Sequence, residues 1–327
     1  MSMQPTRLSR RDLPLTEMAL GLVLITVLAR RWIAPAFQSP AVSHWATVFI
    51  AVCTQAMPFL VLGVSLSGLI AGYVRPATLA RILPTRTALA VPLAAIGGAV
   101  LPGCECSSVP VAARLAERGV AFPAALAFLL ASPAINPVVL VATAVAFPHQ
   151  PRFVAARFVA SVITATVVGW IWMRVGKTEW LSKELNRHQH DHDASSWSVA
   201  TSTALHDFLQ AGGYLVVGAA TAATLQTVVP RTVLDRVAGS GPLAVLALGL
   251  LAVILSICSE ADAFVATGFT QFSPTARLAF LVVGPMVDIK LIALQTGTFG
   301  RRFAQRFAPL TFAVAIAVSA VVGVGLR

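Results

Sequence analysis

The sequence predicts an all-α membrane protein, a polytopic bundle of about eight to ten helices. Of its 327 residues, 57% are hydrophobic and only 11% are charged, whereas a soluble domain carries about 25% charged residues. Stretches without Asp, Glu, Lys or Arg recur along the whole chain, at residues 32–74, 87–104, 119–151, 158–173, 208–230, 241–259 and 307–326. Several of them are long enough for a spanning helix, which needs about 20 apolar residues. No alternation of polar and apolar residues indicates a β-barrel.

The net charge of +11 comes largely from arginines that lie between the apolar stretches. Short cytoplasmic loops of membrane proteins carry such an excess of Lys and Arg. The charge therefore predicts orientation in the bilayer, and we expect no nucleic-acid partner. The four cysteines (Cys53, Cys104, Cys106 and Cys258) all lie in apolar stretches, so a framework of disulfides is not expected.

The first half of the chain begins with residues 1–44, an N-terminal segment that contains a first helix and basic residues that predict a cytoplasmic N-terminus. Residues 45–175 form a first transmembrane repeat. Its expected elements are a span at 45–73 kinked by Pro58, a hairpin at 87–119, an interrupted span at 122–147 and a span at 152–175.

A polar linker is expected at residues 176–202. It contains a His/Asp tract with His188, His190 and His192, residue types that bind zinc or nickel. A solvated linker with chance histidines is the alternative.

A second transmembrane repeat is expected at residues 203–327. Its elements are a span that begins near residue 205, apolar stretches at 241–259 and 278–294, and a terminal span at 307–326 that follows three arginines.

The most informative motif is Cys104-Glu105-Cys106-Ser107, which lies between Pro102-Gly103 and Pro110. The segment that follows, residues 111–119, is too short to span, so the motif is expected at the turn of a re-entrant hairpin. Irregular backbone at membrane depth occurs where protein or a watery cavity satisfies its polar groups. An ionisable residue there indicates a functional site.

A second break is expected where Pro133 and Pro137 flank Asn136, because each proline removes a backbone donor. Broken helices of this kind form substrate sites in secondary transporters. The last third of the chain has comparable features in Cys258, Glu260 and Asp262, and then in Asp288 and Lys290 close to Pro285.

These features recur at a fixed distance along the chain, which predicts an internal duplication. A shift of 152 positions (258 − 106) aligns Cys106-Ser107 with Cys258-Ser259, Pro133 with Pro285 and Asn136 with Asp288. A shift of 155 positions (218 − 63) aligns Gly63 with Gly218 and Gln55-Ala56 with Gln210-Ala211. If the hairpin is re-entrant, each repeat crosses three times and the repeats are inverted, the arrangement we favour. If the hairpin crosses, the repeats are parallel.

The candidate site combines thiols with charged residues. Thiolates are soft ligands suited to Cu(I), Zn(II) and thiophilic metalloids. Cys104 and Cys106 converge on one ion if the backbone between them is extended, and the duplication brings Cys258 toward them from the other half. The carboxylates would accept protons that metal binding releases. Asp288 and Lys290 neutralise each other only weakly on a regular helix, and a break at Pro285 would relax this. The predicted substrate-binding residues are Cys104, Glu105, Cys106, Ser107, Asn136, Cys258, Glu260, Asp262, Asp288 and Lys290.

With residues 104–112 and 132–137 together, the chain resembles the predicted-permease family once called DUF318, from about the second span to the C-terminus. That family includes bacterial organoarsenical efflux permeases. The resemblance implies a multi-pass protein of the bacterial plasma membrane that exports a metalloid. A glutamate separates the two thiols here, whereas the arsenical exporters carry small or aromatic residues around their cysteines. An arsenical substrate is therefore in question, and a metal ion such as zinc stays open.

The predicted function is that of a secondary transporter for a soft metal or metalloid, not of an enzyme, and no cofactor is expected. The sequence has no Gly-x-x-x-x-Gly-Lys-[Ser/Thr] motif for ATP hydrolysis. One alternative is a zinc or other transition-metal transporter. Another, of a different class, is a membrane thiol-disulfide oxidoreductase that uses Cys104 and Cys106. The expected partners are the lipid bilayer and a small-molecule or ion substrate, and a homo-oligomer or a membrane partner subunit stays open.

Overall fold

The computed structural model describes residues 39–73, 84, 86–100, 104–176, 196–228 and 241–326, and the described part is nearly all helical, without strands. Six of its helical stretches are long and apolar enough to cross a membrane. The chain divides into two compact units, Met1–Thr47 and Val48–Arg327. Of the first unit only residues 39–47 are described, as the start of a helix that continues into the second. The predicted class, an all-α multi-pass protein, is confirmed.

The first half of the chain contributes the helices from α2 to α8. They are α2 (Pro40–Tyr73), α4 (Thr87–Gly97), the 3-10 helix η1 (Gly98–Val100), α5 (Glu105–Glu117), α6 (Phe122–Ile135), α7 (Pro137–Ala146) and α8 (Pro151–Val175).

The second half of the chain contributes the other described helices. They are α9 (Ser196–Val228), α11 (Pro242–Leu255), α12 (Asp262–Thr267), α13 (Pro274–Met286), α14 (Ile289–Phe299), α15 (Arg301–Gly323) and the 3-10 helix η4 (Val324–Leu326).

Several helix boundaries agree with the sequence, and two differ from it. The predicted spans at 45–73 and 152–175 correspond to α2 and α8. Helix α9 begins at Ser196, inside the expected polar linker, and α15 begins at Arg301, so its arginines belong to the helix. The expected first span at residues 13–29 and the His/Asp tract lie outside the described residues.

Proline determines where many of these helices begin. Pro137, Pro151, Pro242 and Pro274 are each the first residue of a helix, a position where the missing N–H would have no partner in the helix anyway. Pro58 instead lies inside α2 without ending it, which is tolerated in a bundle where neighbouring groups satisfy the freed carbonyl.

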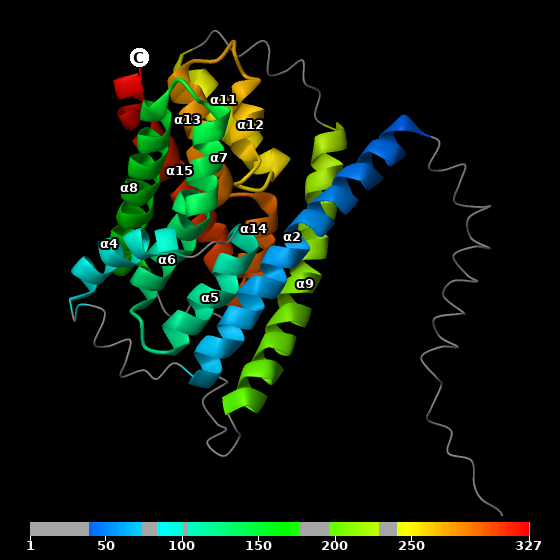
Figure 1. Cartoon of the computed structure of the whole chain (residues 1–327), viewed down its shortest axis with the longest axis vertical. Coiled ribbons are helices and arrows are strands. Elements are labelled where there is room, and N and C mark those ends of the chain that lie inside the picture. The colour runs from blue at the N-terminus through cyan, green and yellow to red at the C-terminus, as the bar shows by residue number, and fades with distance from the viewer. Residues whose placement is uncertain are drawn as a thin grey trace, which may run out of the picture. The chain divides into compact units, whose positions relative to one another are not determined.

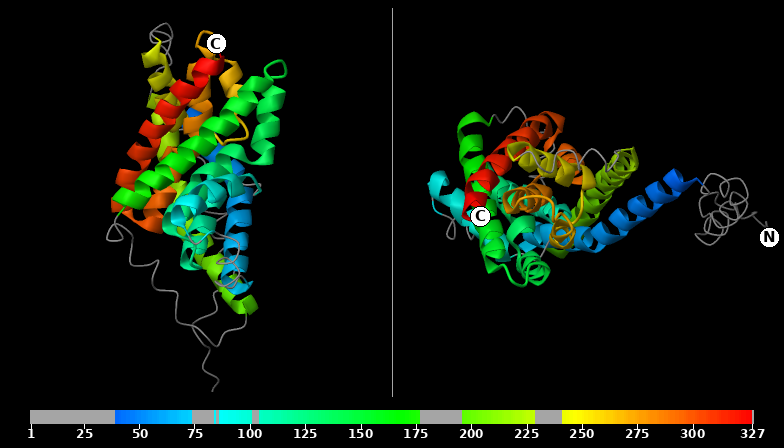
Figure 2. Two further views of the ribbon diagram at one scale, coloured as in Figure 1. Left: turned by 90° about the vertical axis from the view of Figure 1, so that its left-hand side faces the viewer. Right: turned by 90° about the horizontal axis from the view of Figure 1, so that it is seen from above.

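Within Val48–Arg327 the short helices α4 and α5 lie toward one end, and α11 and α12 lie toward the other (Figure 1 and Figure 2). Figure 1 shows α4 and α5 in its lower part and α11 and α12 in its upper part, and the left view of Figure 2 agrees. Helices α8 and α15 lie side by side in both figures and in the contacts between elements. The most buried spans are 122–146, which comprises α6 and α7, and 274–299, which comprises α13 and α14. These two interrupted spans form the centre of the bundle.

Glycine allows α2 to approach the Cys-Glu-Cys hairpin closely. A Cβ atom at Gly63 would lie 2.4 Å from the Cα of Ser107 on α5, so a larger residue must push the two backbones apart. Small residues serve this purpose at helix interfaces within membranes.

We expect Gly63→Ala to destabilise the folded protein by about 1–3 kcal/mol, the usual cost of overpacking. Gly213→Ala on α9 is the matched control, because a Cβ there would meet nothing within 4 Å. The measurement is the loss of folded protein on heating in detergent. Equal curves for the two variants would show that α2 and α5 are not packed as described.

Candidate functional site

Each of the two central spans is interrupted by a residue that caps the next helix. Asn136 is fully buried between α6 and α7, and its Oδ1 accepts a hydrogen bond from the N–H of Val139 at 2.9 Å. Asp288 lies between α13 and α14, and its Oδ1 accepts one from the N–H of Leu291 at 2.5 Å. A side-chain oxygen at this position satisfies a backbone donor of the first turn.

The second interruption lies at Asp288 and not at Pro285, which is inside α13. Asp288 has an extended backbone and precedes α14. Asp288 and Lys290 therefore do not lie on the same regular helix. As a result Asp288 Oδ2 lies 3.4 Å from Lys290 Nζ. The two residues form an ion pair that a continuous helix would disfavour.

The Cys-Glu-Cys motif forms the deep end of α5. Cys104 is the N-cap residue, with an extended backbone, and Glu105 is the first helical residue. The backbone from Glu105 to Cys106 is therefore helical and not extended. Ser107 donates a hydrogen bond through its hydroxyl to the carbonyl oxygen of Cys104 at 2.9 Å. All four residues are fully buried.

Lys290 joins this helix to α14. Its Nζ lies 2.7 Å from Glu105 Oε1, and it contacts Cys258 Sγ at 3.8 Å. With Asp288 these residues form the Lys290 cluster: Lys290, Glu105, Asp288 and Cys258. Because an ammonium has three donors, a single lysine serves all three neighbours. The cluster thus gathers residues from the α5 hairpin and from the last third of the chain.

The Lys290 cluster has two carboxylates for one ammonium. Glu105 Oε2 is buried and has no hydrogen-bond partner among the described residues, and Asp288 Oδ2 has only its ion pair with Lys290. Buried charge without a partner is costly, so these oxygens are the natural place for a positively charged ligand or a proton.

The thiols are near the cluster but are not arranged as a finished metal site. The described residues include no group of three or more His, Cys, Asp or Glu side chains that could hold a metal ion. All four cysteines are free, and Cys104, Cys106 and Cys258 are buried. Cys258 lies in the segment between α11 and α12 and contacts Lys290. Metal ligation would require this thiol to lose its proton.

Asp262 has a structural partner that the sequence did not indicate. Arg157 on α8 is fully buried, and its guanidinium bonds both carboxylate oxygens of Asp262, at 2.8 and 2.7 Å. It also donates to Thr143 Oγ1 at 2.9 Å and to the carbonyl oxygen of Ser259 at 3.3 Å. This arginine was overlooked in the sequence, although an arginine in the second turn of an apolar span is itself a signal.

The other predicted residues fall into two groups. Glu260 is partly buried, and its Oε2 has no hydrogen-bond partner, so it adds a further carboxylate beside the cluster. Asn136 acts as a helix cap, and nothing in the contacts described above assigns it to a ligand. The histidines at 188, 190 and 192 lie outside the described residues.

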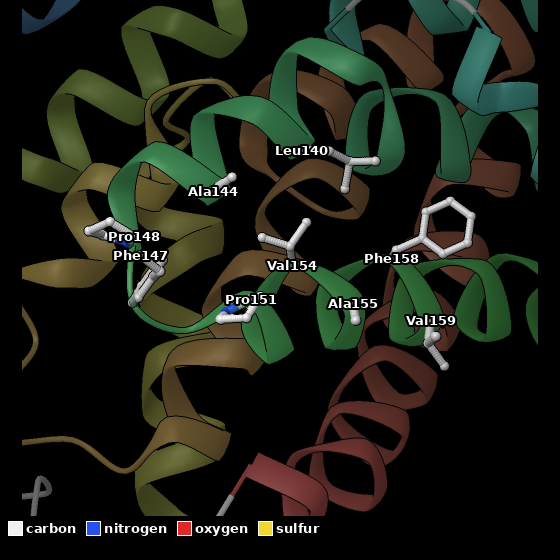
Figure 3. A pocket seen from close by; sticks show the side chains of 9 residues that line it. All are labelled: Leu140, Ala144, Phe147, Pro148, Pro151, Val154, Ala155, Phe158 and Val159. Atoms are coloured by element: carbon white, nitrogen blue, oxygen red, sulfur yellow. The ribbon is translucent and has the colours of Figure 1, made fainter.

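An apolar groove on the described part of the protein lies elsewhere. Figure 3 shows it between α7 and α8, with a volume of about 530 Å³. Its lining is apolar and contains Phe147, Phe158 and Val159 but no predicted site residue. Such a surface suits lipid acyl chains and has no charged side chain that would bind an ion.

Comparisons with known proteins agree with this architecture. Residues 41–324 match a family model described as "Predicted permease". The chain is 35% identical over 285 residues to a Streptococcus mutans protein named as a candidate subunit of a two-component membrane permease complex, and covers 94% of it. It is 36% identical over 278 residues to the UPF0718 protein YcgR of Bacillus subtilis, and again covers 94% of it. These alignments include 85% and 84% of the present chain. No solved structure gives a significant match.

Proposed function

Because the chain belongs to the predicted permease family, we propose that it is a secondary transporter that moves a soft metal or metalloid ion through a site at the Lys290 cluster. Family membership and the six apolar helices make it a multi-pass membrane protein, and its bacterial relatives indicate the plasma membrane. Membership in a permease family favours transport over catalysis.

The observation that supports the proposal most directly is the position of the cluster. Glu105, Lys290 and Cys258 meet at the inner ends of interrupted helices, where a transporter keeps its substrate site. The three residues come from distant parts of the chain: Lys290 and Glu105 are 185 positions apart. An apolar core would stabilise the fold at least as well as buried thiols beside carboxylates and an ammonium. The presence of these polar groups therefore favours a role in binding.

We propose further that the site lies between duplicated halves. The shift of 155 positions that aligns Gly63 with Gly218 also carries Thr87, the start of α4, to Pro242, the start of α11. The shift of 152 carries Phe122 and Pro137, the starts of α6 and α7, to Pro274 and Ile289, the starts of α13 and α14. The capping bonds of Asn136 and Asp288 also correspond. These agreements support one ancestral unit used twice.

The hairpins support an inverted relation between the halves. If the repeats were parallel, α4 and α5 would lie at the same end as α11 and α12. They lie at opposite ends in Figure 1, as expected for repeats related by an axis in the membrane plane.

The side chains present favour a cationic substrate over a neutral arsenical. Thiols bind both Zn(II) and trivalent arsenic, but the cluster also has two carboxylates for one ammonium, and the free Oε2 of Glu105 adds a hard, negative ligand that only a cation would use. Zinc or a similar transition metal is therefore the first candidate, and an arsenical is the second. Uptake into inverted membrane vesicles, compared for Zn(II), Cu(I) and As(III) species, tests the assignment.

Serine in place of Cys104, Cys106 or Cys258 is expected to reduce this uptake by about tenfold or more, since loss of an outer-shell partner alone costs 10–100-fold in many metal sites. The coupled ligands should be non-additive, so the triple variant should be little worse than each single one. Cys53→Ser is the control, because Cys53 lies on α2 and is only half-buried.

The three variants also separate two kinds of site. Normal uptake by Cys258→Ser, with loss in the other two, would contradict a three-thiol site and leave a two-thiol site on α5. Normal uptake of every substrate by all three variants would refute the thiol site altogether.

The S. mutans relative is named as a complex subunit. That name supports the expectation that the present chain works with a second membrane subunit. The test is to produce the chain together with the proteins encoded next to its gene, to purify it in mild detergent and to measure the mass of the complex. A mass equal to that of this chain alone would contradict the expectation.

A further inference from the structure

Three ion pairs among the described residues join positions far apart in the sequence, and each of them connects α2–α8 to α9–α15. They are Arg114 with Asp207, Arg157 with Asp262, and Lys290 with Glu105. The last belongs to the Lys290 cluster. The other two lie on either side of it and have no role in the function proposed above.

The first of these, the α5 lock, consists of Arg114, Asp207, Ser67 and Glu117. Arg114 Nη2 lies 2.9 and 3.1 Å from the two carboxylate oxygens of Asp207 on α9. Its Nε donates to Ser67 Oγ on α2 at 3.3 Å, and Ser67 donates to Asp207 Oδ2 at 2.6 Å. The last turn of α5 is thus tied to two long helices at once.

The second, the α12 lock, consists of Arg157, Asp262, Thr143 and Ser259. Its bidentate ion pair ties the first residue of α12 to α8, and the bond to the carbonyl of Ser259 holds the segment that follows Cys258. The side chains of Arg157 and Asp262 are only 0% and 3% exposed, compared with 7% and 11% for Arg114 and Asp207.

The two locks lie toward opposite ends of the bundle. Arg114 follows Glu105 by nine residues on α5, which places it about 14 Å from the central cluster, toward the outer end of that helix. Asp262 is the first residue of α12, a short helix in the upper part of Figure 1. The α12 lock begins one turn after Cys258, because the N–H of Asp262 bonds the carbonyl oxygen of Cys258 at 3.1 Å. Each lock therefore lies on one side of the Lys290 cluster, and each holds a short helix against a long helix of the other half.

We propose that the α5 lock and the α12 lock are the two gates of the transport path, and that the structure with both locks closed is the occluded state. Opening the α5 lock releases α5 and gives the cluster access to one side of the membrane. Opening the α12 lock releases α12 and gives access to the other side. Ion pairs suit this role because charge-assisted contacts are short and directional. The guanidinium of Arg157 contacts Asp262 through two nitrogens, and Arg114 contacts both oxygens of Asp207 through Nη2.

The inference depends on the proposed transport function, but its test requires no substrate. In a Cys53→Ser background the remaining thiols, Cys104, Cys106 and Cys258, are buried reporters at the centre. Their reaction with a membrane-impermeant methanethiosulfonate is measured in right-side-out and in inside-out vesicles. The variants are Arg114→Gln and Arg157→Gln, and Asp207→Asn and Asp262→Asn address the same locks from the partner side.

We expect Arg114→Gln and Asp207→Asn to increase labelling by about tenfold from one side only, since 1.4 kcal/mol of lost closing energy changes an equilibrium by that factor. Arg157→Gln and Asp262→Asn should increase it from the opposite side only. The matched controls are Arg301→Gln and Arg152→Gln, exposed arginines at the first turns of α15 and α8, which should leave labelling unchanged.

Sidedness separates a gate from general destabilisation. Labelling that rises from both sides in each variant would show loosened structure and refute the gates. Labelling that rises from the same side in the variants of both locks would also refute the gates. Labelling that does not rise in the variants of either lock would refute them too. If an arginine variant folds poorly, the isosteric Asp→Asn variant of the same lock provides the decision. If the variants of the two locks show opposite sidedness but the protein transports no metal, the gate proposal is supported and the proposed substrate is wrong.

Discussion

Lys290→Met is expected to abolish transport and to lower the stability of the folded protein by about 3–5 kcal/mol, the usual cost of removing one partner of a buried ion pair. Methionine is unbranched and only one atom shorter than lysine, so the main loss is one of charge. It would leave Glu105 and Asp288 buried near each other without a cation. The measurements are vesicle uptake and the fraction of protein that stays folded on heating in detergent.

Two further variants test whether charge balance is the cause. Glu105→Gln alone leaves Lys290 paired with Asp288, so it should cost less stability than Lys290→Met. The double variant Lys290→Met/Glu105→Gln restores the net charge of the original cluster and should recover stability but not transport. If Glu105→Gln destabilises as strongly as Lys290→Met, packing around the cluster and not its charge is responsible.

The sequence was sufficient for the class and for much of the helix map. Apolar stretches without charge identify spans because no other fold satisfies the backbone in lipid, so α2 and α8 agree closely with prediction. The predicted polar linker, residues 176–202, is too long at its C-terminal end, because the segment 196–204 contains Ser, Thr and Trp and has low hydropathy. Their helix is stabilised by packing: a Cβ at Gly72 would lie 2.4 Å from the carbonyl oxygen of Ser196.

The candidate site could be predicted in part. Cys104, Glu105 and Cys106 were evident from helix breakers around ionisable residues, and Asp288 and Lys290 from a charge pair inside an apolar stretch. The contact between Glu105 and Lys290 could not be predicted, because no local pattern connects residues 185 positions apart. Asp207 and Arg114 were missed for the same reason. Each looks like an ordinary charge near a helix end until tertiary packing brings the two together.

Arg157 illustrates what the sequence leaves open. It lies on the second turn of α8, where a basic residue would normally belong to the membrane surface. Instead its side chain is fully buried and makes four hydrogen bonds, two of them to Asp262. Arg157→Gln is therefore expected to cost about 3–5 kcal/mol of stability, since it leaves the carboxylate of Asp262 buried and unpaired.

The control is Arg152→Gln on the same helix, an exposed position where a change of charge should cost less than about 0.5 kcal/mol. Adding Asp262→Asn to Arg157→Gln removes the stranded charge and should recover much of the lost stability. Arg157→Lys should be intermediate, because an ammonium cannot bond two carboxylate oxygens in the fork geometry of a guanidinium. Equal thermal stability of Arg157→Gln and Arg152→Gln, measured on the purified proteins in detergent, would mean that the buried pair does not hold α12 in place.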